Sequence, residues 1–448
     1  MPDTLESLAH ALLEAATKAG ADAADALAVE GRSISVETRA GKLEQAERSE
    51  GVDIGLRVLI GQRQACVSAS DTRAETMAAM AERAVAMARE APEDPNIGLA
   101  DPSEIARDWD LAALDLADPA AEPAAAALEE DALRAEAAAR AVKGVSQVDG
   151  AGAGYGRSAL HIALSNGFSG GFAQTSRSLS CVAITGTGTG MERDWYADAR
   201  TYQADLMDAE EIGRRAGERA VSRAGARKPK TGAYPVVYDE RVAGSLIGHL
   251  IGAINGSAIA RGSSWLRDAL GEQVLPTGLT LTEDPHRPRV SGSRPFDAEG
   301  LPTHARRIVD AGVLTGWTLD LATARKLGLK STANASRSTS APPSPGTSNL
   351  LLTQGTQTQA ELLAEMGTGL LITSLMGSSI NPTTGDYSRG ASGFWVEKGE
   401  IAYPVNECTV AGNLRDMLKT LTPANDGRDW LSLVCPSLRV EGLTLAGE

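Results

Sequence analysis

The sequence predicts an α+β fold in which an N-terminal α+β region is followed by a β-rich C-terminal domain. Helical periodicity is confined to a few segments, and most of the remaining chain alternates apolar and polar residues between Gly, Pro and Asn turns. The texture of the sequence changes at a basic linker, residues 227–232. We therefore predict an N-terminal α+β domain over residues 1–120, a central α+β segment with a mainly antiparallel sheet over 121–230, and a β-rich C-terminal domain over 231–448.

The first domain is predicted to open with a helix that Thr4 caps and Gly20 ends. Apolar residues recur there at helical spacing: Leu5, Leu8, Ala9, Leu12, Leu13 and Ala16. Alternating residues then predict strands over 33–38 and 52–60, and a turn leads into a third strand over 63–68.

Two further helices are expected on either side of a connecting segment. Asp71 is predicted to cap the first, whose core face carries Met77, Met80, Ala84 and Met87. Residues 92–123 are rich in Pro, Asp and Ala and form the connection, and an Ala- and Glu-rich helix is expected over 124–142.

The central segment then changes to strands, over residues 145–155 and 159–165, and, after an Asn166-Gly167 hairpin turn, over 168–175 and 179–185.

A helix follows these strands. Asp208 and Glu211 predict a capping box at its start. Its arginines are expected on a solvated face: Arg214, Arg215, Arg219 and Arg223.

In the C-terminal domain the sequence predicts a strand over 234–238, an apolar helical stretch over 242–259 and a short helix over 358–366, among many short β runs.

Composition limits the possible functions. A length of 448 residues suggests two or three domains at ~150 residues each. The 58 acidic and 43 basic residues give a net charge of −15, which argues against direct, non-specific binding of nucleic acid. No apolar run approaches the ~18 residues of a membrane span, and the acidic first six residues do not resemble a signal peptide. The four cysteines form no CxxC pair, so we expect a cytoplasmic protein without a disulfide framework.

The chain is poor in recognisable catalytic motifs. None of its five histidines is followed by the Glu of an HExxH or HExxxH motif, and no GxSxG elbow occurs. Asp297 and Glu299 form a carboxylate pair beside Pro and Gly residues. Such a pair is typical of a turn, and general acid–base catalysis is the alternative.

The region around these carboxylates resembles a known family. Motifs in that family's order occupy residues 284–285, 296–303, 309–314, 331–337, 384–390, 393–400 and 436–440. The densest of them reads Thr384-Gly385-Asp386-Tyr387-Ser388-Arg389-Gly390. Over nearly its whole length the chain resembles the TldD/PmbA family.

The family has two branches, which differ in a zinc motif. The TldD branch carries HExxxH on the helix that opens the C-terminal domain. With the register set by Asn255 and Arg261, Ile247 and Gly252 occupy the two His positions of this chain, and Gly248 occupies the Glu position. The chain therefore resembles the PmbA (TldE) branch, in which no residue is expected to bind a metal or to be catalytic.

The resemblance implies a non-catalytic subunit of a cytoplasmic TldD/TldE metalloprotease that degrades or processes peptides and unfolded segments. It implies a heterodimer with a TldD-type subunit that supplies the zinc, a possible homodimer, and no cofactor in this chain. Whether the chain is an enzyme on its own is left open. The candidates for a substrate cleft are Thr384, Asp386, Ser388 and Gly390, with Asp297 and Glu299 second. A purely structural role in turns is an equal alternative for these residues.

Two other functions remain open. The chain could be an autonomous hydrolase whose site combines His249, Cys408 and the acids near Asp386. It could also be a regulatory binding protein, as the family's link to gyrase modulation implies. His249 itself is predicted to be a hydrogen-bonded core or interface residue, because it lies among apolar residues of a helix.

Overall fold

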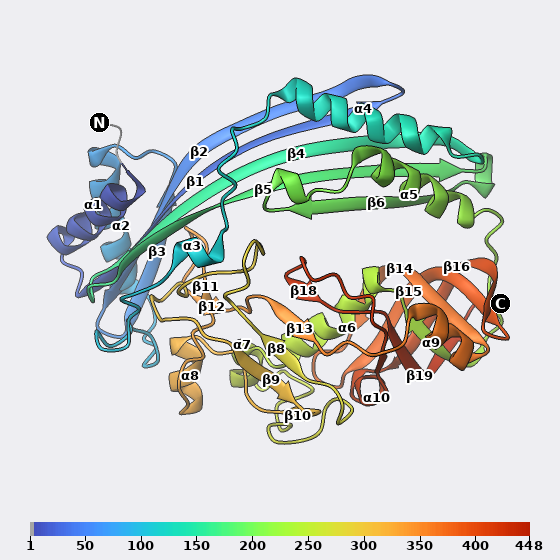
Figure 1. The fold of residues 1–448 in the computed structure, drawn as a ribbon. Helices are drawn as coiled ribbons and strands as arrows, with labels where there is room; N and C mark the ends of the chain where they lie inside the picture. The colour runs from blue at the N-terminus through green and yellow to red at the C-terminus, as the bar shows by residue number, and fades with distance from the viewer. Residues whose placement is uncertain (1–3) are drawn as a thin grey trace.

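Two long β-hairpins build the N-terminal half of the molecule. In the computed structural model, which describes residues 4–448, they form a curved sheet that arches over a β-rich C-terminal domain (Figure 1). This arrangement confirms the predicted fold class. Residues 1–3, part of the segment in which no signal peptide was predicted, lie outside the described residues. Among the described helices, none is both long and apolar enough to cross a membrane.

The strands of the arch are longer than the sequence predicts. In order along the chain they are β1 (Ala23–Arg39), β2 (Lys42–Ile60), β3 (Arg63–Ala69), β4 (Val145–Leu164), β5 (Ser169–Thr185) and β6 (Glu192–Arg200). The first half of β2 is exposed throughout. Apolar alternation is therefore missing there, and only backbone pairing with β1 makes this segment a strand.

The arch is one antiparallel sheet with the strand order β3-β2-β1-β4-β5-β6. Its central pair, β1 with β4, joins the predicted N-terminal domain to the predicted central segment. The division between these two parts at residue 120 stays a prediction, and no sheet edge separates them.

Helices cover one face of the arch. They are α1 (Leu5–Ala19), α2 (Ala74–Glu90), α4 (Ala125–Ala141) and α5 (Ala209–Ser222), with a short α3 (Leu111–Leu114) in the connecting segment. Side chains alternate along β1, so Ala26 and Ala28 pack towards α1 and α2, whereas Leu27 faces the C-terminal domain.

Two predicted helix caps differ from the structure. Thr4 caps α1 as expected, but α2 begins after Arg73, and Asp71 instead accepts the backbone N–H of Arg73 before the helix. Asp208 caps α5, whereas Glu211 does not complete a capping box. Its carboxylate is held by two arginines of the next turn, which compete successfully for it.

The C-terminal domain is built around a small barrel. Its strands β7 (Gly232–Tyr238), β14 (Gly369–Ile380), β15 (Asp386–Glu397), β16 (Glu400–Asn413) and β19 (Leu438–Ala446) pair in the order β16-β15-β14-β7-β19, and a β16–β19 pairing closes the ring. β17 (Thr422–Pro423) pairs with β19. The helices of this domain are α6 (Glu240–Ala253), α7 (Gly256–Ala260), α8 (Leu321–Leu327), α9 (Gln359–Met366) and α10 (Leu414–Lys419).

A second sheet flanks the barrel, with the order β10-β9-β8-β13-β18. Its strands are β8 (Leu281–Glu283), β9 (Arg306–Asp310), β10 (Val313–Leu314), β13 (Leu350–Leu352) and β18 (Leu433–Val434), and a separate ribbon pairs β11 (Ala335–Ser336) with β12 (Ser344–Pro345). The predicted helix over 242–259 is in fact two helices, because the side chain of Asn255 caps α7 and interrupts the chain after α6.

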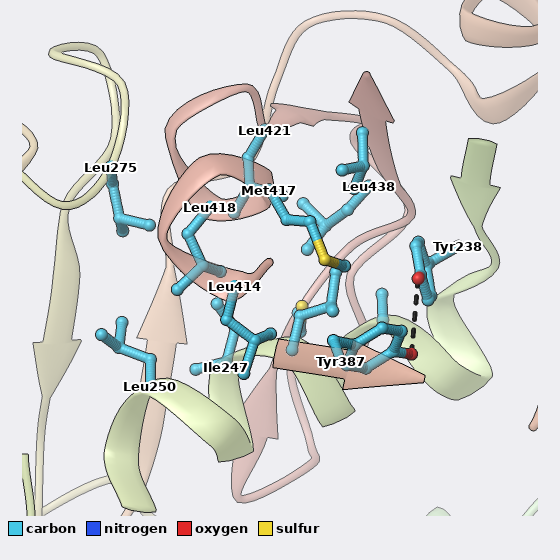
Figure 2. Close-up of a cluster of buried hydrophobic side chains, with 14 of the residues drawn as sticks. Tyr238, Ile247, Leu250, Leu275, Tyr387, Leu414, Met417, Leu418, Leu421 and Leu438 are labelled. Atoms are coloured by element: carbon cyan, nitrogen blue, oxygen red, sulfur yellow. Dashed lines mark hydrogen bonds between the residues drawn. The ribbon is translucent and has the colours of Figure 1, made fainter. Parts of the chain in front are cut away.

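The main hydrophobic core lies between α6, α10 and the barrel. Figure 2 shows Ile247 and Leu250 of α6 directed into the cluster that contains Leu414 and Leu418 of α10. Tyr238 of β7 contributes to the same core.

Candidate functional site

Three of the predicted cleft residues share one face of strand β15. Asp386, Ser388 and Gly390 alternate along the strand, so they point to the same side of the barrel wall. Between them, Tyr387 is buried and faces the core on the other side. The sequence therefore identified one continuous face, although its members have different surroundings.

At the start of β15 this face forms a hydrogen-bonded turn. The hydroxyl of Thr384 donates to Asp386 Oδ2 at 2.6 Å, and the amide of Asn413 donates to Asp386 Oδ1 at 3.0 Å. These bonds, that of Thr384 above all, lower the pKa of the Asp386 carboxyl. Thr384 and Asp386 are both exposed, and their contacts are those of the turn alternative.

Further along β15 the same face borders a cavity of about 950 Å³ between β6 of the arch and β14–β16 of the barrel. Gly390 and its successor on this face, Ser392, line it. Asp386 and Ser388 are not among the residues that line this cavity. The cavity walls thus come from the central segment and the C-terminal domain, which are distant in sequence.

Exposed apolar side chains line this cavity and were not found from the sequence. Met376 of β14 has 73% of its surface exposed, and Trp195 of β6 and Met191 before it each have 50% exposed. A large apolar side chain with so much exposure beside a cavity is a signal of binding. No local motif indicates it, because β6 alternates like any other half-buried strand.

One carboxylate between two arginines joins the arch to the barrel at this cavity. Arg223 Nε donates to Asp194 Oδ2 at 2.6 Å, and Arg241 Nη1 donates to Asp194 Oδ1 at 3.2 Å. The remaining donors of Arg223 reach Thr373 on β14 at 3.0 Å and Ser392 on β15 at 3.1 Å. The prediction of a solvated face is therefore wrong for Arg223, which is buried.

Asp297 and Glu299 lie elsewhere, buried where the C-terminal domain meets the arch. Asp297 accepts three backbone N–H groups, from Glu299, Leu301 and Ala335. Burial raises the pKa of Asp297 to about 6. Burial and the neighbouring Asp297 and Asp320 raise the pKa of Glu299 well above its usual value. These contacts hold a loop, as in the turn alternative.

The residues proposed for an autonomous hydrolase are not brought together. Cys408 pairs with Ala391 in the β15–β16 ladder, five residues along β15 from Asp386, a separation of roughly 17 Å. Burial raises the pKa of the Cys408 thiol to about 11, which keeps it protonated at neutral pH.

His249 does not join these residues either. It lies edge-on to the buried ring of Tyr387, with ring centroids 5.9 Å apart, and so on the opposite side of β15 from Asp386. The prediction of a hydrogen-bonded imidazole is wrong for Nε2, which is buried without a partner among the described residues. Burial, and to a lesser extent Arg389, lowers the pKa of this imidazole.

Three family models match successive parts of the chain: PmbA/TldA metallopeptidase domain 1 over residues 24–88, the central domain over 117–224 and the C-terminal domain over 231–447. Metalloprotease PmbA of Escherichia coli O157:H7 is 37% identical over 445 residues, which cover 99% of this chain and 96% of that protein. The chain belongs to the PmbA/TldD family.

Solved structures agree with this assignment. A candidate modulator of DNA gyrase from Bacteroides thetaiotaomicron has a TM-score of 0.89 and 30% identity, with 98% of each chain covered. TldE from Thermococcus kodakarensis has a TM-score of 0.84 at 21% identity, with 98% of this chain and 99% of that chain covered, and it shows the same fold.

The zinc-motif positions of this PmbA/TldD-family chain do not fit a metal ion. Ile247 has no exposed surface and packs in the core, as Figure 2 shows. Gly248 and Gly252 are exposed, with nothing within 4 Å of the place where a Cβ would lie. None of the three side chains offers a nitrogen, oxygen or sulfur ligand. Positions 247 and 252 are five residues apart, as the two His of HExxxH are, and this spacing places them roughly 140° apart around a regular α-helix.

Proposed function

We propose that this chain is the zinc-less, PmbA/TldE-type subunit of a two-chain metallopeptidase that acts on peptides and unfolded segments in the cytoplasm. A TldD-type partner would supply the catalytic zinc and the water-activating Glu. The observation that carries the proposal is the absence of a ligand atom from the side chains at positions 247, 248 and 252, in a chain that matches all three family models. The names metalloprotease PmbA and TldE, given to similar proteins, support it.

The cavity beside β6 is the part of this chain that we assign to the substrate. β6 is the edge strand of the arch, because only β5 pairs with it in the sheet. An extended peptide can add to such an edge through main-chain hydrogen bonds, which do not depend on its sequence. Trp195, Met191 and Met376 would add apolar contact with the side chains of an unfolded segment.

The floor of this cavity is suited to hold its shape while substrate binds. Arg223 connects β6 to β14 and β15 through Asp194, Thr373 and Ser392. A buried arginine whose donors are used in this way resists movement of one wall relative to the other. The chain would thus contribute a rigid wall to a cleft that the partner subunit completes.

Co-purification with a TldD-type chain that carries HExxxH, followed by an assay on a fluorescent unstructured peptide, tests the proposal. We expect the two chains to purify together and only the pair to cleave the peptide, with loss of cleavage on addition of EDTA. Cleavage by this chain alone, or an active partner that never binds it, would contradict the proposal. A TldD-type chain with its HExxxH Glu replaced by Gln is the matched control for the pair.

A second candidate function rests on the name of the Bacteroides thetaiotaomicron protein, a candidate modulator of DNA gyrase. The net charge of −15 disfavours direct contact with DNA, so this function would operate through protein contact. Binding to purified gyrase in the absence of any TldD-type chain would favour it over the protease subunit.

A further inference from the structure

Three metal-ligating side chains meet at the end of the arch where α1 packs on the sheet. They are Glu6 and His10 of α1 and His161 of β4, and their ligand atoms all lie within 4.8 Å of one another. Glu6 and His10 are four residues apart and share a face of the helix. His161 reaches them from the strand beneath, so the helix and the sheet each contribute to the cluster.

The two imidazole rings converge on a single hydroxyl. Ser169 Oγ of β5 lies 3.1 Å from His10 Nε2 and 2.8 Å from His161 Nε2. A hydroxyl has one proton to donate, so at least one of these nitrogens bonds to it through an N–H. Both Nε2 atoms therefore point at the same place, as the ligands of a metal site do.

The sheet leaves space for this position of His161. Gly171 is its partner in the β4–β5 register. A Cβ at residue 171 would come within 2.8 Å of His161 Nδ1 and 2.5 Å of the Leu160 carbonyl oxygen. The absence of a side chain at residue 171 thus allows the imidazole to lie over β5 towards α1.

Two imidazoles and one carboxylate are a donor set typical of zinc with one open position. Tetrahedral zinc at ~2.0–2.1 Å from each ligand requires ligand atoms about 3.3 Å apart. Glu6 and His10 are exposed, so their side chains are free to rotate by the small amount that closes the cluster. A water molecule or the Ser169 hydroxyl could take the fourth position.

We propose that Glu6, His10 and His161 bind a zinc ion that joins helix α1 to strand β4. This site is independent of the proposed protease function. Its ligands belong to the helix-covered end of the arch, and none of them lines the cavity between β6 and the barrel. The ion would fasten α1, which otherwise packs on the sheet through apolar contacts of Leu8, Ala9 and Leu12.

Calorimetric titration of the EDTA-treated full chain with zinc chloride tests the site. We expect one zinc ion per chain, and we expect His10→Gln and His161→Gln each to weaken zinc binding by about tenfold or more. His304→Gln is the matched control, since His304 is an exposed histidine of the C-terminal domain and should leave zinc binding unchanged.

A thermal melt supplies a second readout that does not depend on peptidase activity. Zinc should raise the Tm of the wild-type chain and of His304→Gln, but not of His10→Gln, whose exposed side chain can be replaced without loss of the fold. The proposal would be overturned if the wild-type chain bound no zinc, or if His10→Gln and His161→Gln bound it as tightly as the control.

Discussion

The carboxyl groups of Asp297 and Glu299 lie two residues apart and are both buried, but they accept different numbers of backbone hydrogen bonds. Asp297 has three N–H donors around it, whereas Glu299 accepts one, from Leu321. Asp297 therefore holds the negative charge more readily, and Glu299 is the group whose pKa is raised more by burial and by the neighbouring carboxylates. The pair, for which the sequence favours a turn over acid–base catalysis, supports loops through backbone hydrogen bonds in the fold.

This pair makes stability depend on pH in a definite direction. A carboxyl whose pKa is higher in the folded chain than in the unfolded chain binds more protons when folded, so the free energy of unfolding falls as pH rises. For Asp297 the fall runs from about pH 4 to about pH 6, and the raised pKa of Glu299 adds a fall in the same direction above the ordinary pKa of a glutamate. Glu299→Gln removes the contribution of Glu299 to this pH dependence and keeps a side-chain oxygen that can accept the Leu321 N–H.

We therefore expect Glu299→Gln to gain stability relative to the wild type as pH is raised from 5 to 8, measured by urea unfolding at both values. Glu82→Gln, a change at an exposed carboxyl of α2, serves as the control and should follow the wild type. Parallel pH profiles for Glu299→Gln and the wild type would show that Glu299 ionises normally in the folded chain.

At the scale of single elements, helix α6 contains two glycines at the positions that the resemblance aligns with the zinc motif. Gly248 and Gly252 lie on its exposed side within the helix, where glycine costs stability because the unfolded chain is so flexible. We expect Gly248→Ala to raise the free energy of unfolding by about 0.5–1 kcal/mol, measured by urea denaturation.

Gly244 of the same helix is the matched control for this change. A Cβ there would come 3.0 Å from Leu433 Cδ2, so Gly244→Ala should gain little or nothing. If Gly248→Ala also left the free energy of unfolding unchanged, a side chain on the exposed face of α6 would have less free space than the structure of the single chain shows.

One face of strand β15 is hydrogen-bonded at the start of the strand and borders the cavity further along. Gly390 borders the cavity, whereas Asp386 is engaged by Thr384 and Asn413. Gly390→Leu should fill part of the cavity and raise the KM of the reconstituted pair for an unfolded peptide about tenfold, with little change in stability.

Asp386→Ala is the contrasting variant on this strand. It should lower the free energy of unfolding only slightly through the lost turn bonds, because the carboxylate is exposed to water. Peptide hydrolysis and urea unfolding of both variants check the pair of expectations. An unchanged KM for Gly390→Leu would remove this cavity from the substrate path, and a loss of hydrolysis in Asp386→Ala at unchanged stability would place Asp386 in the cleft instead.

At the scale of the whole molecule, several contacts join the N-terminal half to the barrel domain, and two of them are ion-pair junctions centred on the buried Asp194 and Asp25, the first of which borders the cavity. At that place Asp194 binds Arg223 and Arg241. At the other, Asp25 of β1 binds Arg57 of β2 and Arg337 of the C-terminal domain, beside the apolar contact of Phe168 with Phe296.

The two halves of the molecule pack closely against each other at the Asp25 junction. Asp25 is fully buried, and a Cβ at Gly55 of β2 would come 2.2 Å from the Thr339 carbonyl oxygen, so the C-terminal loop runs directly against the strand. Removing the carboxylate would leave two arginines without their partner in a dry environment.

We therefore expect Asp25→Ala to lower the free energy of unfolding by about 3–5 kcal/mol, measured by urea denaturation, and to increase protease sensitivity between the two halves. Glu47→Ala, at an exposed position of β2, is the control and should change stability little. A small effect of Asp25→Ala would mean that the apolar contact of Phe168 with Phe296, and not the ion pair, holds this junction.

Local sequence pattern was sufficient for several features of this protein. Apolar periodicity located α1, an Ala- and Glu-rich composition located α4, the Asn166-Gly167 turn located the hairpin between β4 and β5, and the ordered motifs indicated the family. These features depend on residues close together in the chain, where side-chain spacing and turn chemistry act directly.

Contacts between distant segments were decided only by the tertiary structure. The exposed half of β2 becomes a strand through its partner, and Arg223 is buried because β14 and β15 approach it from 150 and 169 residues away. The cavity beside β6, and the meeting of Glu6 and His10 with His161, likewise arise from non-local packing. Such contacts leave no local pattern, because burial and charge pairing depend on which surfaces the completed fold brings together.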